Sequence, residues 1–534
     1  MQDIVIHRDI IWLGCAITFL LIACANAIAG EGQGDPLAVL TPLAQSSQAI
    51  EVGSTALTIA HAINPTVNVA ASTTTLDALA RELQPAIERV TDPREKLAVM
   101  GDYIYKRWGF ADHSALPADV FVSFADVLDK KQWNCFGLSV LYIALGERIG
   151  LPFELVSGRG HVCVQLKGTN LYVETTDGGK VYEGKEYLAQ YLPFPCVDPN
   201  EYKAASAREA VAVLLTQTGG AVIAQGKPDF GLACFQHALE FDPSYAEAHA
   251  ALGFLYAQIG PVDRAIDEFK IASKADPQLR EAFGGLGAAL HAKGDLDGAA
   301  QALQKAVALC DKQPEAMFNL GQVLYDSGNL DGSIDAYRKY IALMPRDVDG
   351  YVRLAFPLED TGKLDEALAA YDQALRIAPN HPDALINAGG ILEKQQKWDA
   401  ARSAYEKCVS AHPKNALAFA GLARVFAATH RDAEAEKAFT QSLDIDRGNP
   451  ATWIDFAKMD REHGNFAGAV VKLNNALLLD PNEPETHVEL ALTYLEQKDE
   501  LKAAQHAAIA ANLGESLPES LQRILPAEPK EVKP

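Results

Sequence analysis

The chain has 534 residues, with 47 Lys and Arg against 70 Asp and Glu, and its formal net charge is −23. Nucleic-acid binders present a basic face, so this acidic balance argues against a nucleic-acid partner. A hydrophobic content of 49% and only eight cysteines exclude a disordered chain and a disulfide scaffold. Because single cores stop growing near ~250–300 residues, the length predicts more than one domain.

The N-terminus carries an apolar segment that predicts export. No charged residue lies between Ile10 and Ala29, which is typical of the h-region of a secretory signal. Three cleavage sites are open, a lipoprotein box ending at Cys24 and ordinary sites after Ala27 or Ala29, and so is an uncleaved membrane helix. We therefore expect residues 1–29 to be a signal peptide or a lipoprotein or membrane anchor. The rest of the chain is expected in the periplasm or cell envelope.

Residues 30–75 are rich in Ala, Thr, Ser and Gln and show no helical stripe. This composition is typical of a linker, with one strand expected at 56–59. A separate module is expected over residues 76–205, where apolar residues first take helical spacing.

A cysteine is expected at the first turn of a buried helix in this module. The chain is apolar from Cys135 to Leu145, and Gly150 is a helix-stop signal. The start of a helix favours a negative charge, so this position favours the thiolate over the thiol. Cys135 is therefore a candidate nucleophile.

Two strand-like runs follow, at 161–166 and 171–176, and the residues between them predict a hairpin. If the loop closes symmetrically, His161 and Glu174 lie diagonally on one face of the sheet, within reach of a long side chain. Asp177 falls on the opposite parity. The pattern therefore predicts Glu174, rather than Asp177, as the partner of His161.

A Cys at a helix start, then a His on one strand and a carboxylate on the next, resembles the transglutaminase-like branch of the papain-type cysteine hydrolase superfamily. The matching motifs are Asn134-Cys135, Gly160-His161 and the Val-Glu-Thr-Thr run at 173–176. The resemblance implies that Cys135 is the nucleophile, His161 its base and Glu174 the group that orients the imidazole. In such a triad the thiolate attacks an acyl carbon and the imidazolium protonates the leaving amine.

From residue 212 to residue 517 the sequence repeats every 34 residues, in nine frames. Position 8 of each frame is Gly or Ala, and position 24 is aromatic in most frames. Two antiparallel helices approach closely only where one carries a small residue, and a bulky neighbour fills the space beside the crossing. Prolines, which end the second helix, recur at intervals of 34 or 68 residues: Pro243, Pro277, Pro345, Pro379, Pro413 and Pro481.

This pattern resembles the tetratricopeptide repeat (TPR) family, which implies a superhelical solenoid whose concave face binds peptides or proteins. Stacked repeats also generate an extended groove for purely physical reasons. Position 6 of three successive frames is polar, with Asn319, Arg353 and Asn387. Asn can both donate to and accept from a peptide backbone, and Arg can grip a carboxylate. The row is either a partner-binding row or a solvated row without a ligand.

The predicted fold class is therefore multi-domain: an α+β transglutaminase-like module, then an all-α TPR solenoid, then a disordered tail at 518–534. The sequence has no metal-ligand spacing, so we expect no metal and no cofactor. Two functions are open. In the first, the repeats recruit a protein substrate and Cys135 performs acyl transfer or amide hydrolysis. In the second, the module is not catalytic and the chain is a cell-envelope interaction scaffold.

Overall fold

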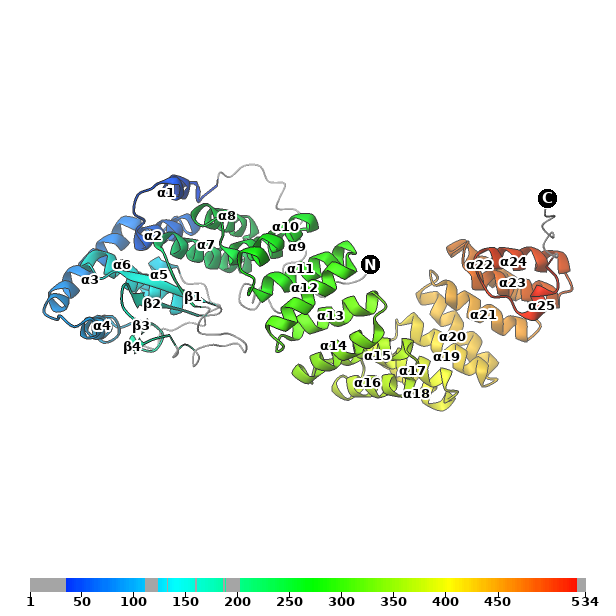
Figure 1. Cartoon of the computed structure of the whole chain (residues 1–534). Coiled ribbons are helices and arrows are strands. Elements are labelled where there is room, and N and C mark those ends of the chain that lie inside the picture. Colours follow the sequence, from blue (N-terminus) through cyan, green and yellow to red (C-terminus); the bar gives the residue numbers. More distant parts are fainter. Residues whose placement is uncertain are drawn as a thin grey trace, which may run out of the picture. The chain divides into compact units, whose positions relative to one another are not determined.

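The computed structural model describes residues 35–110, 123–131, 133–158, 161–185, 188 and 202–525. The chain divides into two compact units, residues 1–343 and 344–534. In the described residues, the first unit holds an α+β module and four helix pairs, and the second holds five helix pairs and a short final helix (Figure 1). Cys24 and the rest of the segment 1–29 lie outside the described residues. Every helix among the described residues is too short or too polar to span a bilayer.

The module begins with helices and continues with a sheet. After a 3-10 turn at Ala38–Leu40, its helices are α1 (Thr41–Gln45), α2 (Val52–Ile63), α3 (Val69–Glu88), α4 (Pro93–Gly101), a π-helical turn (Asp102–Arg107), α5 (Phe124–Lys130) and α6 (Cys135–Ile149). The strands are β1 (Phe153–Gly158), β2 (His161–Leu166), β3 (Leu171–Glu174), β4 (Lys180–Glu183) and β5 (Lys203–Ala205).

The described strands form one antiparallel sheet in the order β4-β3-β2-β1-β5. Helix α6 packs against β1 and β2. Between β2 and β3, Val164 lies opposite Val173 and Gln165 opposite Tyr172. This is the symmetric hairpin register predicted from the sequence, and it places both functional strands beside the start of α6.

The lead-in before the module was expected to be a linker with a strand at 56–59, and this prediction is wrong for its described part. Residues 56–59 lie inside α2, which buries Val52 and Ile59. The carboxylate of Glu147, on α6, accepts hydrogen bonds from the backbone N–H groups of Val52 (2.6 Å) and Gly53 (3.3 Å). Two donors at the start of α2 are thus satisfied by a side chain far away in the sequence, which stabilises a helix that local composition does not favour.

The first helix pair shares its core with the module. Val211 and Leu215 of α7 (Ala207–Ala224) belong to the same buried cluster as Leu57 of α2 and Leu141 of α6. The lead-in is also tied to α8 (Pro228–Phe241), because Nε2 of His237 lies 2.6 Å from a carboxylate oxygen of Asp35. The module and the first pair therefore form a single core.

Nine helix pairs occupy residues 207–512 of the described chain and confirm the 34-residue frames. From the second pair onward, the first helix of each pair begins at the first residue of its frame. In the first unit, after α7 and α8, the helices are α9 (Ala246–Ile259), α10 (Val262–Ala275), α11 (Arg280–Lys293), α12 (Leu296–Leu309), α13 (Pro314–Asp326) and α14 (Leu330–Leu343). In the second unit they are α15 (Val348–Asp360), α16 (Leu364–Ile377), α17 (Pro382–Lys394), α18 (Trp398–Ala411), α19 (Ala416–Ala428), α20 (Asp432–Ile445), α21 (Pro450–Glu462), α22 (Phe466–Leu479), α23 (Pro484–Glu496) and α24 (Glu500–Asn512).

The predicted disordered tail, 518–534, is ordered in its first part, so this prediction is wrong for residues 518–525. Helix α25 (Glu519–Gln522) follows the last repeat. Its Leu521 is fully buried in a cluster with Leu517 and Ala507. A terminal repeat has no further repeat to cover its apolar side, so this short helix takes the role of a cap. Residues 526–534 lie outside the described residues.

Small residues and aromatic residues meet in most pairs as the periodic pattern predicts, and in the third pair Leu303 takes the place of the ring against Gly287. In the sixth pair, a Cβ atom added to Gly389 would lie 2.6 Å from the ring of Tyr405. Tyr405 is fully buried. The neighbouring Gly390 has much more room, because its added Cβ would meet only the Tyr405 hydroxyl oxygen, at 3.9 Å.

These two adjacent glycines give a matched test of the packing. We expect Gly389→Ala to destabilise the array by about 1–3 kcal/mol, because the ring must move. Gly390→Ala is expected to be neutral or to stabilise by up to ~1 kcal/mol, because Ala favours the helix and meets no close atom. The midpoints of urea unfolding of the full chain measure both changes. Equal midpoint shifts for the two variants would contradict this account.

Candidate functional site

The candidate nucleophile is the first residue of α6. Asn134 is the N-cap of this helix, and its side-chain oxygen accepts a hydrogen bond from the N–H of Gly137 at 2.9 Å. The side chain of Cys135 is nearly buried, with 9% of its surface exposed. The structure therefore places the thiol where the sequence predicted it, at the positive end of a helix dipole.

The predicted base and its partner are in contact. His161 begins β2, and its Nε2 lies 2.7 Å from Oε2 of Glu174, the last residue of β3. Glu174 is fully buried. Its other oxygen, Oε1, accepts hydrogen bonds from the N–H (3.0 Å) and the hydroxyl (2.5 Å) of Thr176. Both oxygens of the buried carboxylate thus have donors, as a buried charge requires.

The imidazole of His161 links the thiol to the carboxylate. Burial lowers the pKa of His161, but hydrogen bonds to Cys135 and Glu174, together with the negative charges of both groups, outweigh burial and raise this pKa to about 9. Because Nε2 contacts the carboxylate of Glu174, Nδ1 is the ring nitrogen that contacts the thiol of Cys135. The imidazole thus contacts the thiol on one hand and the carboxylate on the other, which is the arrangement that the sequence predicted.

Neither Asp177 nor the other reduced cysteines of the described residues belong to the site. Asp177 accepts a hydrogen bond from Lys180 at 2.7 Å, so its carboxylate serves the turn before β4. Cys163, Cys234 and Cys408 are reduced cysteines with fully buried side chains. In the described part of the chain, no group of three or more His, Cys, Asp or Glu side chains is arranged to hold a metal ion.

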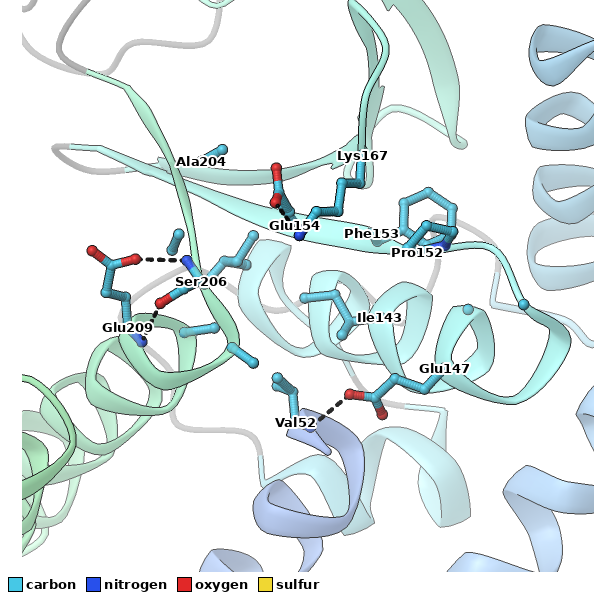
Figure 2. Close-up of a pocket in the computed structure, with 16 residues that line it drawn as sticks. Val52, Ile143, Glu147, Pro152, Phe153, Glu154, Lys167, Ala204, Ser206 and Glu209 are labelled. Atoms are coloured by element: carbon cyan, nitrogen blue, oxygen red, sulfur yellow. Dashed lines mark hydrogen bonds and ion pairs between the residues drawn. The ribbon is translucent and has the colours of Figure 1, made fainter. Parts of the chain in front are cut away.

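A cavity of about 710 Å³ lies at the other end of α6 (Figure 2). Ile143, Gly146 and Glu147 line it from the last turns of that helix, and Phe153 lines it from β1. Helical rise places these turns about 12–18 Å from the first residue of α6. None of the three triad residues lines this cavity, so it is not the binding site of the thiol chemistry.

The predicted partner-binding row is divided between the two units. Asn319 lies on α13 in the first unit and is half-buried, whereas Arg353 and Asn387 lie on α15 and α17 in the second unit. Asn387 hydrogen-bonds the side chain of Tyr371, and the Arg353 guanidinium lies 5.8 Å from the ring centroid of Phe356. Their role in partner binding stays a prediction.

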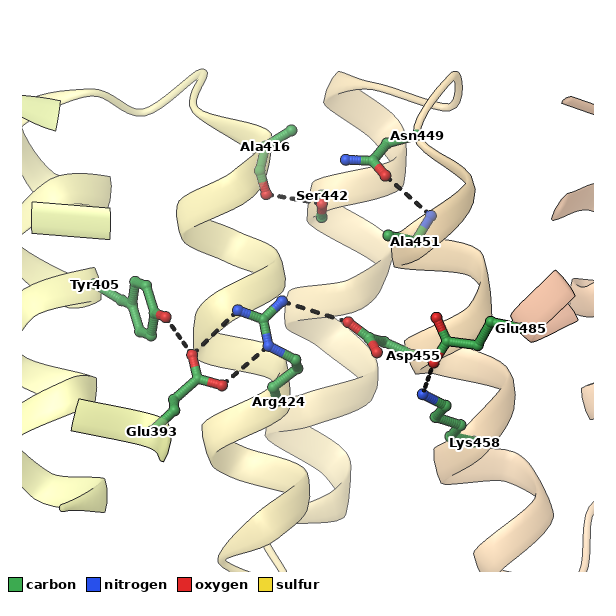
Figure 3. Close-up of polar contacts among 10 residues, drawn as sticks. All are labelled: Glu393, Tyr405, Ala416, Arg424, Ser442, Asn449, Ala451, Asp455, Lys458 and Glu485. Atoms are coloured by element: carbon green, nitrogen blue, oxygen red, sulfur yellow. Dashed lines mark hydrogen bonds and ion pairs between the residues drawn. The ribbon is translucent and has the colours of Figure 1, made fainter. Parts of the chain in front are cut away.

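Ion pairs that were not predicted from the sequence join successive first helices of the second unit (Figure 3). We call this set of charged side chains the ladder. Arg424, on α19, makes two hydrogen bonds to Glu393 of α17 (3.0 and 3.1 Å) and one to Asp455 of α21 (3.3 Å). Lys458 continues the ladder to Glu485 of α23 at 2.5 Å. Arg424 and Lys458 share position 9 of their frames, but their partners Glu393, Asp455 and Glu485 fall at positions 12, 6 and 2, so the stacking of the helices brings the opposite charges together.

Comparisons with known proteins agree with this architecture. Residues 70–216 match the model of the transglutaminase-like superfamily. Residues 287–328 match the TPR repeat model, and residues 310–522 match the model of the C-terminal domain of cilia and flagella-associated protein 70. The chain thus carries a transglutaminase-like domain followed by TPR repeats.

Two curated relatives and two solved structures illustrate the range of similarity. A UPF0162 protein of Xylella fastidiosa strain Temecula1 is 22% identical over 227 residues, which are 41% of this chain and 81% of the relative. Its counterpart in strain 9a5c is 23% identical over 217 residues, which are 39% and 77%. A tetratricopeptide repeat protein from Parabacteroides merdae is 19% identical and covers 46% of this chain and 97% of its own, with a TM-score of 0.42. YrrB, described as a TPR protein with an unusual peptide-binding site, is 22% identical and covers 34% and 95%, with a TM-score of 0.32.

The raised pKa of His161 gives the fold a pH dependence. Above pH 6.5 the unfolded chain releases a proton that the folded chain keeps until about pH 9, so the contribution of this group to stability is lost as the pH rises through that window. Glu174→Gln removes one of the charges that raise the pKa, and we expect a smaller loss of stability across the same window. Urea unfolding midpoints of both proteins from pH 6 to pH 10 measure the difference. Identical pH dependence in both would contradict the assignment.

Proposed function

We propose that the protein is a thiol enzyme that acts on an amide or acyl bond of a peptide or protein recruited by its TPR array. One observation carries this proposal: Cys135 at the start of α6 shares a hydrogen-bonded imidazole with the buried carboxylate of Glu174. A purely structural cysteine needs no such partner, because a buried thiol behaves as a small apolar group.

The first half-reaction follows from these three groups. The Cys135 thiolate attacks the carbonyl carbon of the substrate, and a C–S bond forms as the carbonyl oxygen becomes an oxyanion. The backbone N–H of Cys135, at the helix start, is the expected donor to that oxyanion. The His161 imidazolium then gives its proton to the leaving amine as the C–N bond breaks, which leaves a thioester on Cys135 and a neutral imidazole.

The second half-reaction depends on the acceptor. Water or an amine attacks the thioester, and His161 takes the proton of the attacking group while the C–S bond breaks and the thiolate returns. Water gives hydrolysis or deamidation, and an amine gives a cross-link. Glu174 keeps the imidazole oriented through both steps.

The repeats supply the recruitment part of the proposal. The TPR array implies protein or peptide partners, and we assign their binding to the first helices of the repeats, with Asn319 in the first unit and Arg353 and Asn387 in the second. We also propose that the protein works in the cell envelope, on the basis of the uncharged segment from Ile10 to Ala29.

The thiol part is tested by alkylation of the full chain. Among the reduced cysteines of the described residues, we expect iodoacetamide to label Cys135 in preference to Cys163, Cys234 and Cys408, because Cys135 is 9% exposed and the other three are fully buried. The rate is expected to stay high below pH 7, where an ordinary thiol (pKa near ~8.5) reacts slowly. His161→Ala is expected to lower the rate at pH 6 at least tenfold, because the thiolate loses its cationic partner. Peptide mapping by mass spectrometry identifies the labelled cysteine.

Two outcomes would overturn the proposal that the protein is a thiol enzyme. One is a rate of Cys135 labelling that ignores His161→Ala, and the other is a rate that rises only near pH 8.5. Either result would favour the alternative function, in which the module has no catalytic role and the chain is an interaction scaffold of the cell envelope.

The recruitment part is tested by partner capture. We expect replacement of Asn319, Arg353 and Asn387 together by Ala to reduce recovery of a cross-linked partner at least fivefold, with the unfolding midpoint changed little. Unchanged recovery would exclude this row. The control replaces exposed residues on the second helices of the same three repeats by Ala: Lys339, Gln373 and Lys407.

A further inference from the structure

Two buried hydroxyl groups hold the backbone carbonyl of Cys135. The hydroxyl of Ser139 donates to this oxygen at 2.8 Å, and the hydroxyl of Thr175 donates to it at 3.2 Å. The two hydroxyl oxygens are 3.3 Å apart, and both side chains are fully buried. Neither residue has a role in the triad, so the site holds two polar groups that the chemistry above does not use.

The two hydroxyls do different work. Ser139 lies one turn further along α6, and its bond to a carbonyl four residues back is local to the helix. Thr175 is the first residue after β3 and lies 40 residues away in the sequence. Its bond therefore ties the start of α6 to the sheet.

The place of Thr175 in the chain brings it to the site. Thr175 begins the turn that directly follows Glu174, the last residue of β3. Glu174 contacts the imidazole of His161, and Thr175 contacts the backbone of Cys135. Two adjacent residues thus hold the base and the nucleophile.

The backbone of Thr175 is itself fixed by a hydrogen bond from another part of the module. The hydroxyl of Tyr105 donates to the backbone carbonyl of Thr175 at 2.5 Å, and Tyr105 is nearly buried. The Tyr105 ring closes against Gly179, where an added Cβ would lie 2.7 Å from it. Tyr105 therefore contacts the segment that carries Glu174 and Thr175 at two points, the carbonyl of Thr175 and the turn at Gly179.

We propose that Thr175 is a positioning residue, which sets the placement of the Cys135 thiol relative to the His161 imidazole. The inference rests on the proposed thiol chemistry and deepens it. Without the Thr175 hydroxyl, Cys135 keeps the Ser139 bond and its helix, so the fold is kept while the link between helix and sheet is lost. A misplacement of reacting groups by about 1 Å can cost ~100-fold in rate, so even partial loosening is measurable.

The test compares pH profiles of Cys135 alkylation in the full chain. Thr175→Val removes the hydroxyl and keeps the shape, and we expect alkylation at pH 6 to fall about tenfold, with the profile shifted about one pH unit upward. Thr175→Ser restores the hydroxyl and is expected to stay within about threefold of wild type. Thr216→Val is the matched control, because Thr216 is also buried and also donates to a helix carbonyl (Ala212, 2.9 Å) but lies in α7. Its profile is expected to match wild type.

The outcomes separate this inference from the proposed function. A wild-type chain with fast, His161-dependent alkylation and a Thr175→Val profile equal to wild type would overturn the positioning role alone. A wild-type chain without fast alkylation would overturn both. If Thr175→Val does not fold, Tyr105→Phe replaces it, since it loosens the same segment. A shift of the profile in the same direction, by about threefold at pH 6, would support the inference, and no shift would overturn it.

Discussion

The contact between the start of α6 and the β2–β3 hairpin is the constraint on which the candidate site depends. Burying the ionisable pair His161 and Glu174 costs free energy unless each charged atom finds a partner. The hairpin provides those partners, with Thr176 on one carboxylate oxygen and His161 on the other. The pair therefore contributes a fixed orientation of the imidazole. That orientation matters only if α6, which carries Cys135, packs against this hairpin.

The hairpin register and the helix pairs can be predicted from the sequence, because both depend on residues close together in the chain. The hairpin register follows from side-chain alternation and a symmetric loop, which identifies Glu174 as the partner of His161 in preference to Asp177. The nine helix pairs follow from a period that any window of the array shows. Helix α2 escapes sequence reasoning because two donors at its start are satisfied by Glu147, about 95 residues away. The role of Thr175 escapes it for the same reason, since its partner is 40 residues away and is a backbone atom that has no sequence signature.

In the array too, contacts that recur with the 34-residue period can be predicted from the sequence, whereas ion pairs between repeats cannot. The meeting of small and aromatic residues recurs in most frames, so Gly389 and Tyr405 stand out in the 34-residue pattern alone. Arg424 and its partners Glu393 and Asp455 are different, because they hold different positions in three different frames. A search for one repeated slot finds the polar row of position 6, which Gly421 interrupts, and reaches only Asp455 of the ladder. Charges that already neutralise one another across repeats also attract a ligand less than isolated ones, so polar groups outside the ladder are the better candidates for recognition.

The single core that joins the module to its first helix pair also bears on how such chains are assembled. Val211 and Leu215 of α7 are buried among residues of α2 and α6, so a cut between the module and the array would leave apolar surface open on both pieces. Repeats added or lost further along the chain disturb only their neighbours, as in other quasi-one-dimensional proteins. The array is therefore free to change in length during evolution at the pairs between its two ends, whereas the first pair must be inherited together with the thiol module and the last pair together with its cap α25.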